Sequence, residues 1–113
     1  MIDFDNRPWG RWEEYLFEPM YRVKRILVFP GKRLSLQYHE LRSEVWVIVQ
    51  GKAMVTVGDK TFEAGTGDVV RIEKGQLHRI ENHTNETMVF IETQVGVCPE
   101  EDIVRVEDDF GRA

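Results

Sequence analysis

The sequence predicts an all-β fold of the sandwich or jelly-roll type. Short apolar segments of alternating polarity are separated by glycine, proline and asparagine turns, and no long amphipathic helical pattern competes with them. At least seven such segments in 113 residues are typical of two packed antiparallel sheets. The length and the 42% hydrophobic content predict a single domain over residues 1–113 and leave no room for a second core.

The strands are expected between turns that the chain marks clearly. Arg7-Pro8-Trp9-Gly10 reads as a turn, Pro30-Gly31 ends an alternating segment, and Gly58-Asp59 predicts a tight hairpin. The predicted strands are 21–29, 33–39, 44–49, 53–57, 61–62, 68–72, 77–81 and 87–95. Residues 98–113 are polar and acidic, and we expect a tail that packs over the barrel with one short strand at 103–106.

Two glycine-bounded clusters carry side chains that could converge on one metal ion. Side chains alternate across a strand, so Gln37 and His39 share a face, and Glu44 opens the returning strand on the same side. With His78 from the second cluster they form a mixed nitrogen and oxygen set, which suits zinc, manganese, cobalt or iron(II). In the alternative interpretation the histidines are hydrogen-bonded barrel residues, and Gln37 is a core amide or orients a water.

The spacing of these residues resembles the two-part cupin motif. In this chain it reads Gly31, five residues, Gln37-x-His39, four residues, Glu44, six residues and Gly51, followed by Gly67 to His78 and Asn82. Gln37 stands where the motif usually has its first histidine, and Glu73 stands where proline is usual. The resemblance implies a cupin double-stranded β-helix, with Ser43, Arg42 or Asn82 supporting the ligands, although Asn82 could equally stabilise a turn.

Across nearly the whole chain the sequence is similar to one narrower family, the cupin-type mannose-6-phosphate isomerases. These often form the C-terminal domain of bifunctional mannose-1-phosphate guanylyltransferases. The resemblance is carried by Arg7-Pro8-Trp9-Gly10, Tyr21–Arg25, Pro30–Gln37, Arg42-Ser43-Glu44, Trp46, Thr56–Gly58, His78-Arg79, Glu81-Asn82, Gln94–Gly96, Asp102–Arg105, Glu107–Asp109 and Gly111-Arg112.

The chain departs from this family beside the ligands. The family usually reads Gln-x-His-His-His-Arg-Ser-Glu-His-Trp, whereas Glu40, Leu41 and Val45 replace three histidines here. Of the three, only Leu41, in the turn, lies on the ligand side. We therefore expect the metal site to be retained and the lip of the pocket to be altered, which puts the substrate preference in question more than metal binding.

The resemblance implies the interconversion of mannose 6-phosphate and fructose 6-phosphate through a cis-enediol. Zinc is the expected ion, with manganese, cobalt and iron(II) as alternatives. Such a reaction needs a base that moves a proton between two carbons, and our candidates are Glu92 and Lys24. Glu92 faces inward only if Met88 and Phe90 do, and alternation alone does not decide whether Lys24 or Arg25 faces the interior.

The distant phosphate of such a substrate needs cations, and bidentate arginine is its natural partner. The cations near the ends of the motifs are Lys32, Arg33, Arg42, Arg79 and Arg105. Arg33 has the best claim because it shares the alternation of Gln37 and His39, although most of these cations could equally form a solvated face. Trp46 should lie close to the metal, and the aromatic residues that could form a sugar-stacking wall are Trp9, Trp12, Tyr15, Tyr38 and Trp46.

Composition excludes several classes of function. A net charge of −5 argues against a nucleic-acid surface, and no apolar run approaches the ~20 residues of a membrane span. The single Cys98 gets no assigned chemistry, and the first residues lack the features of a secretory signal, so we expect a cytoplasmic protein. A homodimer and a separate nucleotidyltransferase are the expected partners. The competing hypotheses are another metal-dependent cupin enzyme, such as a dioxygenase, and a non-catalytic sugar-phosphate-binding module.

Overall fold

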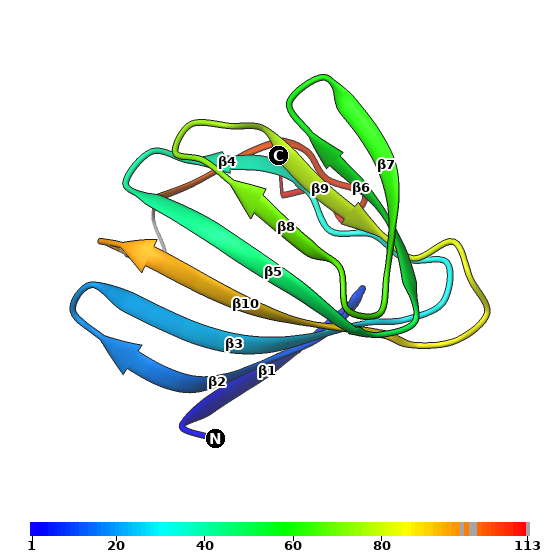
Figure 1. The fold of residues 1–113 in the computed structure, drawn as a ribbon, viewed down its shortest axis with the longest axis horizontal. Helices are drawn as coiled ribbons and strands as arrows, with labels where there is room; N and C mark the ends of the chain where they lie inside the picture. Colours follow the sequence, from blue (N-terminus) through cyan, green and yellow to red (C-terminus); the bar gives the residue numbers. More distant parts are fainter. Residues whose placement is uncertain (98, 100–101, 113) are drawn as a thin grey trace.

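The protein is an all-β barrel, shown in a computed structural model that describes residues 1–97, 99 and 102–112 (Figure 1). Six strands form one sheet, in the spatial order β1 (Asp3–Arg7), β2 (Gly10–Glu18), β3 (Tyr21–Val28), β10 (Met88–Gly96), β5 (Arg42–Gln50) and β8 (Val69–Ile72). Five strands form the other, in the order β11 (Ile103–Glu107), β4 (Leu36–His39), β9 (His78–Glu81), β6 (Lys52–Val57) and β7 (Lys60–Gly65).

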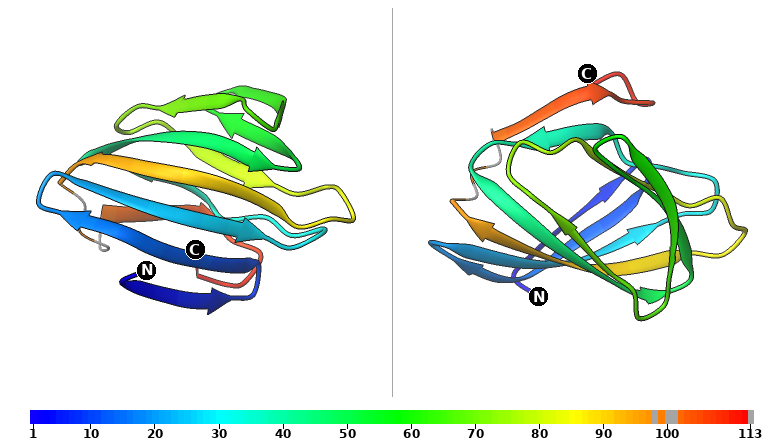
Figure 2. Two further views of the ribbon diagram at one scale, coloured as in Figure 1. Left: turned by 60° about the horizontal axis from the view of Figure 1, so that its bottom comes forward. Right: turned by 45° about the horizontal axis from the view of Figure 1, so that its top comes forward.

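The chain passes back and forth between the two sheets, which confirms the predicted jelly roll. From β4 to β10 it changes sheet repeatedly, so that strands distant in sequence become neighbours, such as β3 and β10. Figures 1 and 2 show the two sheets enclosing a common interior. None of the described residues belongs to a helix with the length and apolarity to cross a membrane. The prediction about Cys98 lies outside the described residues.

The sequence missed an N-terminal hairpin. Only the turn between its strands was predicted, at Pro8 and Trp9, and β1 and β2 pair on either side of it. The charged residues of β2 hid its strand character, because Glu13 and Glu14 are buried against arginines of β3. Gly10 is required here, since an added Cβ would lie 1.9 Å from the carbonyl oxygen of Leu27.

The predicted strands otherwise lie close to their observed bounds. The largest differences are at 61–62, where the strand extends over Lys60–Gly65, and at 33–39, where the strand begins only at Leu36 and Arg33 forms an isolated bridge with Glu81. The predicted tail strand is confirmed, since β11 pairs antiparallel with β4 at the edge of its sheet (Figure 2). The C-terminal residues thus become part of the barrel wall.

The interior of the barrel has an apolar half and a polar half. The inward rows of β3 and β10 are buried and change from apolar to polar along each strand. Register pairs Phe90 with the apolar residues Ile26 and Ile48, and it pairs Glu92 with Lys24 on one side and Trp46 on the other, so Trp46 lies where the two halves meet. The apolar core consists of Ile26, Val28, Ile48, Ala53, Val55, Ala64, Val70, Ile72, Ile80, Met88 and Phe90, with Trp9 and Trp46.

Candidate metal centre

Three predicted ligands meet inside the barrel. His39 ends β4, Glu44 lies near the start of β5 and His78 starts β9, and all three are buried. The Nε2 atom of His39 lies 3.1 Å from Oε2 of Glu44, and the Nε2 atom of His78 lies 3.9 Å from Oε1. One ligand atom from each residue falls within 4.8 Å of the others. The hairpin predicted from sequence thus brings His39 and Glu44 together, and His78 joins them from β9.

The state of His78 fits a metal ligand. Its Nδ1 atom lies 2.9 Å from the carbonyl oxygen of Gln76 and donates to it, which leaves the lone pair on Nε2. Nε2 is buried and has no hydrogen-bond partner among the described residues. Burial lowers the pKa of His78, although the charge of Glu44 opposes that shift. A neutral imidazole with a buried lone pair is the form that binds a metal ion.

The ionised state of Glu44 also fits a metal ligand. Burial raises its pKa, but hydrogen bonds with His39 and Glu92 and the charge of Arg42 hold the pKa well below its usual value. Arg42 donates from Nε to Oε2 at 2.9 Å, and the indole N–H of Trp46 donates to Oε1 at 3.0 Å. Both carboxylate oxygens are therefore oriented by neighbours, as is usual for residues that hold a metal.

Gln37 lies next to the triad. It pairs with His78 across β4 and β9, and its Nε2 atom lies 3.3 Å from Nε2 of His39. Its Oε1 atom accepts a hydrogen bond from Ser35 at 2.5 Å. Exchanging the amide oxygen and nitrogen would turn the oxygen toward His39 and let the Ser35 hydroxyl accept instead. A role for Gln37 as fourth ligand is compatible with this position and stays a prediction.

Glu92 and Lys24, the candidate bases, both face the interior. The row of β10 that holds Phe90 points inward, and Glu92 is buried beside Glu44 with a 2.8 Å hydrogen bond from Gln94. Burial, together with the charge of Glu44, raises the pKa of Glu92 to about 8. Lys24 is paired with Glu92 in register, and its Nζ atom lies 4.5 Å from the centre of the Trp12 ring. Their catalytic roles stay predictions.

A cationic pocket adjoins the triad. Gln37, Arg42 and Glu92 line it and also lie beside the triad, so that the two regions are continuous. Glu92 is the only carboxylate among its described lining residues, whereas the cations that line it are Arg7, Lys24, Arg42, Arg105 and Arg112. Trp9 and Trp12 contribute aromatic surface. Sequence reasoning did not select Arg7 and Arg112 as site residues, although both lie in segments that carry the family resemblance.

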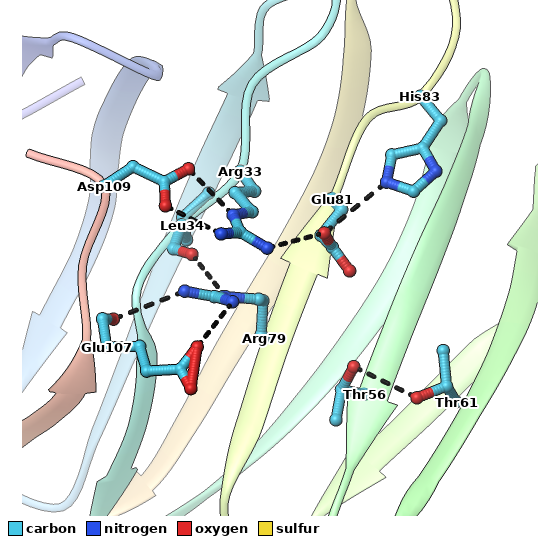
Figure 3. A network of polar contacts seen from close by, with 9 residues as sticks. All are labelled: Arg33, Leu34, Thr56, Thr61, Arg79, Glu81, His83, Glu107 and Asp109. Atoms are coloured by element: carbon cyan, nitrogen blue, oxygen red, sulfur yellow. Dashed lines mark hydrogen bonds and ion pairs between the residues drawn. The ribbon is translucent and has the colours of Figure 1, made fainter.

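Arg33 and Arg79 lie elsewhere, which corrects the preference for Arg33 as a phosphate ligand. Arg33 forms two hydrogen bonds with Asp109, at 2.7 and 2.8 Å, and another with Glu81 at 3.3 Å. Arg79 donates to the carbonyl oxygen of Leu34 and to Glu107 (Figure 3). Neither lines the pocket. Arg33 precedes the regular part of β4, so the alternation of that strand does not extend to it.

Two other predicted residues have structural surroundings. Trp46 is close to the triad as predicted, with its ring 5.6 Å from that of His78, but it is buried against Phe90 and does not line the pocket. Trp46 thus supports Glu44 rather than forming a wall for substrate. Asn82 is fully buried and bonds the backbone of Val28 and Glu86, which confirms the interpretation that it stabilises a turn.

The fold and the buried cluster define a cupin-type barrel with a candidate metal site. Similar solved structures include the cupin domain of Cnp3 from Schizosaccharomyces pombe, with a TM-score of 0.73, 21% identity, and coverage of 76% of this chain and 64% of that one. Another is the capsular polysaccharide assembling protein CapF from Staphylococcus aureus, with a TM-score of 0.79, 23% identity, and coverage of 92% and 31%. A putative sugar phosphate isomerase from Acidithiobacillus ferrooxidans has a TM-score of 0.63, 22% identity, and coverage of 69% and 51%.

The sequence places the chain more narrowly. Residues 4–108 match the family described as "Mannose-6-phosphate isomerase C-terminal", and the chain belongs to that family. It is 41% identical over 107 residues to the alginate biosynthesis protein AlgA of Pseudomonas aeruginosa and 39% identical to the mannose-1-phosphate guanylyltransferase ManC of Salmonella typhimurium. These matches cover 94% of the chain but only 22% of each relative, so the chain spans about a fifth of their length.

Proposed function

We propose that this domain is a metal-dependent isomerase that interconverts mannose 6-phosphate and fructose 6-phosphate. The observation that carries the proposal is the buried His39–Glu44–His78 cluster beside a pocket that holds five cations and one carboxylate. The cluster would hold an ion for the reacting oxygens, and the pocket beside it has a proton-transfer group and a cationic environment for a phosphate. Membership of the isomerase family supports the same reaction.

His39, Glu44 and His78, with Gln37 as fourth ligand, would hold zinc or another divalent ion. When bound, the ion supplies a Lewis acid that polarises the sugar carbonyl and stabilises charge on the neighbouring oxygen. Arg42 and Trp46 fix the carboxylate of Glu44 through its two oxygens. The triad is therefore held in place before any ion arrives, which lowers the cost of binding.

Glu92 would move the proton between the C1 and C2 carbons of the substrate. A raised pKa of about 8 suits a group that takes up a proton and returns it near neutral pH. Lys24, opposite Glu92 in the register of β3 and β10, would stabilise negative charge as the cis-enediol forms. Arg42 and Arg105 would add positive charge for substrate binding to the part of the pocket beside the ligands, because Arg42 bonds Glu44 and Arg105 lies opposite Gln37.

The proposal is tested by an assay of mannose 6-phosphate conversion on protein stripped of metal and reloaded in turn with zinc, manganese, cobalt and iron(II). His78→Ala should abolish both metal binding and turnover. His83→Ala is the matched control, because His83 is exposed and lies outside the triad. Metal-dependent turnover in the wild type and in His83→Ala, together with its loss in His78→Ala, would support the isomerase. Metal binding without turnover under any ion would contradict it.

That second outcome would favour a non-catalytic sugar-phosphate-binding module. The observation behind this candidate is the altered lip, where Glu40 and Leu41 are exposed and their backbone amides donate to Asp102. Binding of mannose 6-phosphate without conversion, measured by calorimetry, would identify it. Because ManC is named a mannose-1-phosphate guanylyltransferase, we propose that this domain works with a nucleotidyltransferase in either case.

We also propose a homodimer. Within one chain, Val49 remains 44% exposed on the outer face of β5. Val95 of β10 and Val69 of β8 extend this surface on the same sheet, with 47% and 58% exposure. Pairing of two copies through this face would bury apolar surface that is now in water. Light scattering on the wild type and on Val69→Asp tests it, and a monomeric wild type would contradict it.

A further inference from the structure

The C-terminal residues form a strap, here defined as residues 102–112, along one side of the pocket. The β11 part of the strap pairs with β4 so that Ile103 lies opposite His39 and Arg105 opposite Gln37. Ile103, Arg105 and Arg112 all line the pocket. Figure 2 shows this segment lying along β4 at the edge of the barrel. The strap therefore supplies one wall of the candidate site.

Asp108 and Asp109 are consecutive in the strap, but their carboxylates bond arginines on opposite sides of it. The Asp108 side chain is only 1% exposed, and it accepts hydrogen bonds from Nε of Arg112 at 2.7 Å, from Nη2 at 3.3 Å and from its backbone N–H at 2.8 Å. Asp109 instead bonds Arg33 of the barrel, outside the pocket. Phe110, next along, packs against the apolar core. One carboxylate thus orients a pocket cation and the other fastens the strap.

The fastening is a small network that we call the latch, made of Arg33, Arg79, Glu107 and Asp109 (Figure 3). Arg33 connects Asp109 to Glu81 of β9. Arg79 is buried, and its guanidinium donates to the carboxylate and to the backbone carbonyl oxygen of Glu107, each at 3.4 Å. The latch joins the strap to β9 and to the segment before β4 by polar contacts alone. It can therefore be weakened without removing apolar core packing.

We infer that the strap carries a phosphate-binding group, in which Arg112 contacts the phosphate of the substrate, Asp108 positions Arg112, and the latch keeps this wall in place. This inference rests on the proposed sugar-phosphate substrate, and it assigns residues to the phosphate end of that substrate. Asp108 engages Nε and Nη2 of Arg112, and the other edge of the guanidinium carries further N–H donors. A planar guanidinium held by a buried carboxylate is pre-organised for two parallel bonds to a phosphate.

The register places Arg7, another cation of the pocket, away from Lys24 along the sheet. Arg7 pairs with Gly10, which lies opposite Val28, four residues along β3 from Lys24. At about 3.3 Å per residue these positions are roughly 13 Å apart along the strand. Arg7 lines the same pocket as Arg112, and no acidic residue other than Glu92 lines its described part. A substrate with a reacting end and a distant dianion matches such a layout.

The first test measures binding of inorganic phosphate, mannose 6-phosphate and mannose to the metal-loaded full chain by calorimetry. We expect Arg112→Ala to weaken both phosphate ligands about tenfold, as the loss of one charge-assisted contact predicts, and to leave mannose unchanged. Arg112→Lys keeps the charge without the planar fork and should fall between. Arg71→Ala, on the exposed outer side of β8, is the control. Equal binding of phosphate by Arg112→Ala and the control would overturn the inference.

The second test addresses Asp108 and the latch. Asp108→Asn should raise KM for mannose 6-phosphate roughly threefold with kcat unchanged, because Arg112 keeps its charge but loses its orientation. Arg33→Ala and Asp109→Asn should each speed amide exchange across residues 102–112 and weaken phosphate binding, and the double variant should add nothing further. Additive effects, or unchanged exchange in the strap, would overturn the role of the latch.

The two proposals fail separately. Phosphate binding that depends on Arg112 in a protein without isomerase activity would support the strap and contradict the isomerase. Isomerase activity that is indifferent to Arg112→Ala and Arg112→Lys would support the isomerase and contradict the strap.

Discussion

The two halves of the barrel interior differ although they are built on the same strands. On β10, Met88 and Phe90 face inward at one end, and Glu92 and Gln94 face inward at the other. The apolar half buries surface that stabilises the fold, whereas each buried polar group costs free energy unless it is paired. In the polar half, Glu44 is bonded to Arg42 and Glu92 to Gln94, around a triad that suits a metal. Stability and chemistry are therefore separated along each strand of this barrel.

The largest effect should come from the polar half, where Glu92→Gln removes the proposed proton-transfer group. We expect isomerase turnover to fall by about 10²–10⁴-fold. The free energy of unfolding should not fall, because the amide replaces a carboxyl that is costly to ionise in this buried site. Steady-state kinetics and denaturant unfolding on the same samples check both expectations, with exposed Glu63→Gln as control. Unchanged turnover would exclude Glu92 as the base and leave Lys24.

The opposite result is expected in the apolar half. Phe90→Ala removes a fully buried ring between β3 and β5 and should lower the free energy of unfolding by about 3–5 kcal/mol. The folded fraction should still bind one metal ion per chain, since the triad does not include Phe90. Denaturant unfolding and metal analysis after gel filtration measure the two quantities. Loss of the metal from folded protein would show that the halves are not separable.

Trp46 lies at the boundary and sharpens the comparison. Trp46→Phe keeps an aromatic ring against Phe90 and His78 but deletes the N–H donor to Glu44. Loss of such a supporting bond typically lowers metal affinity 10–100-fold, or about 1.4–2.7 kcal/mol. Competition with a chromophoric chelator gives the affinity, and thermal unfolding of the metal-free protein is the control. An unchanged affinity would place Trp46 wholly in the apolar half.

The smallest effect is expected at the strap beside the polar half. Hydrogen bonds from Arg112 lower the pKa of Asp108 from its usual 3.8, so the folded state favours the ionised carboxylate. This stabilisation is present above pH 3.8 and is lost as pH falls through the lowered pKa. Asp108→Asn should therefore be less stable than wild type by about 1 kcal/mol at neutral pH, with the gap closing in acid. Unfolding curves from pH 7 to pH 3 test the direction of this pH dependence. A difference in unfolding free energy between wild type and Asp108→Asn that grows in acid would contradict it.

Most of the fold and the core of the site could be predicted from sequence because both depend on local patterns. Turn residues and alternation gave eight strands and the tail strand, and the hairpin that carries His39 and Glu44 fixes their shared face within a few residues. The family motif added His78. The missed hairpin at β1 and β2 shows the limit, since its charged residues look like a surface loop until the arginines of β3 are placed beside them.

Tertiary structure alone decided what completes the pocket. Alternation left two faces open for β10, and only its packing between β3 and β5 turns Glu92 inward. Arg7 and Arg112 come from opposite ends of the chain and line one pocket because β11 folds back along β4. Arg33, which alternation favoured, faces Asp109 instead. Which side chains share a strand face follows from the local sequence, because it depends on backbone geometry over a few residues. Which faces meet depends on pairing between distant strands, and only the folded barrel determines that.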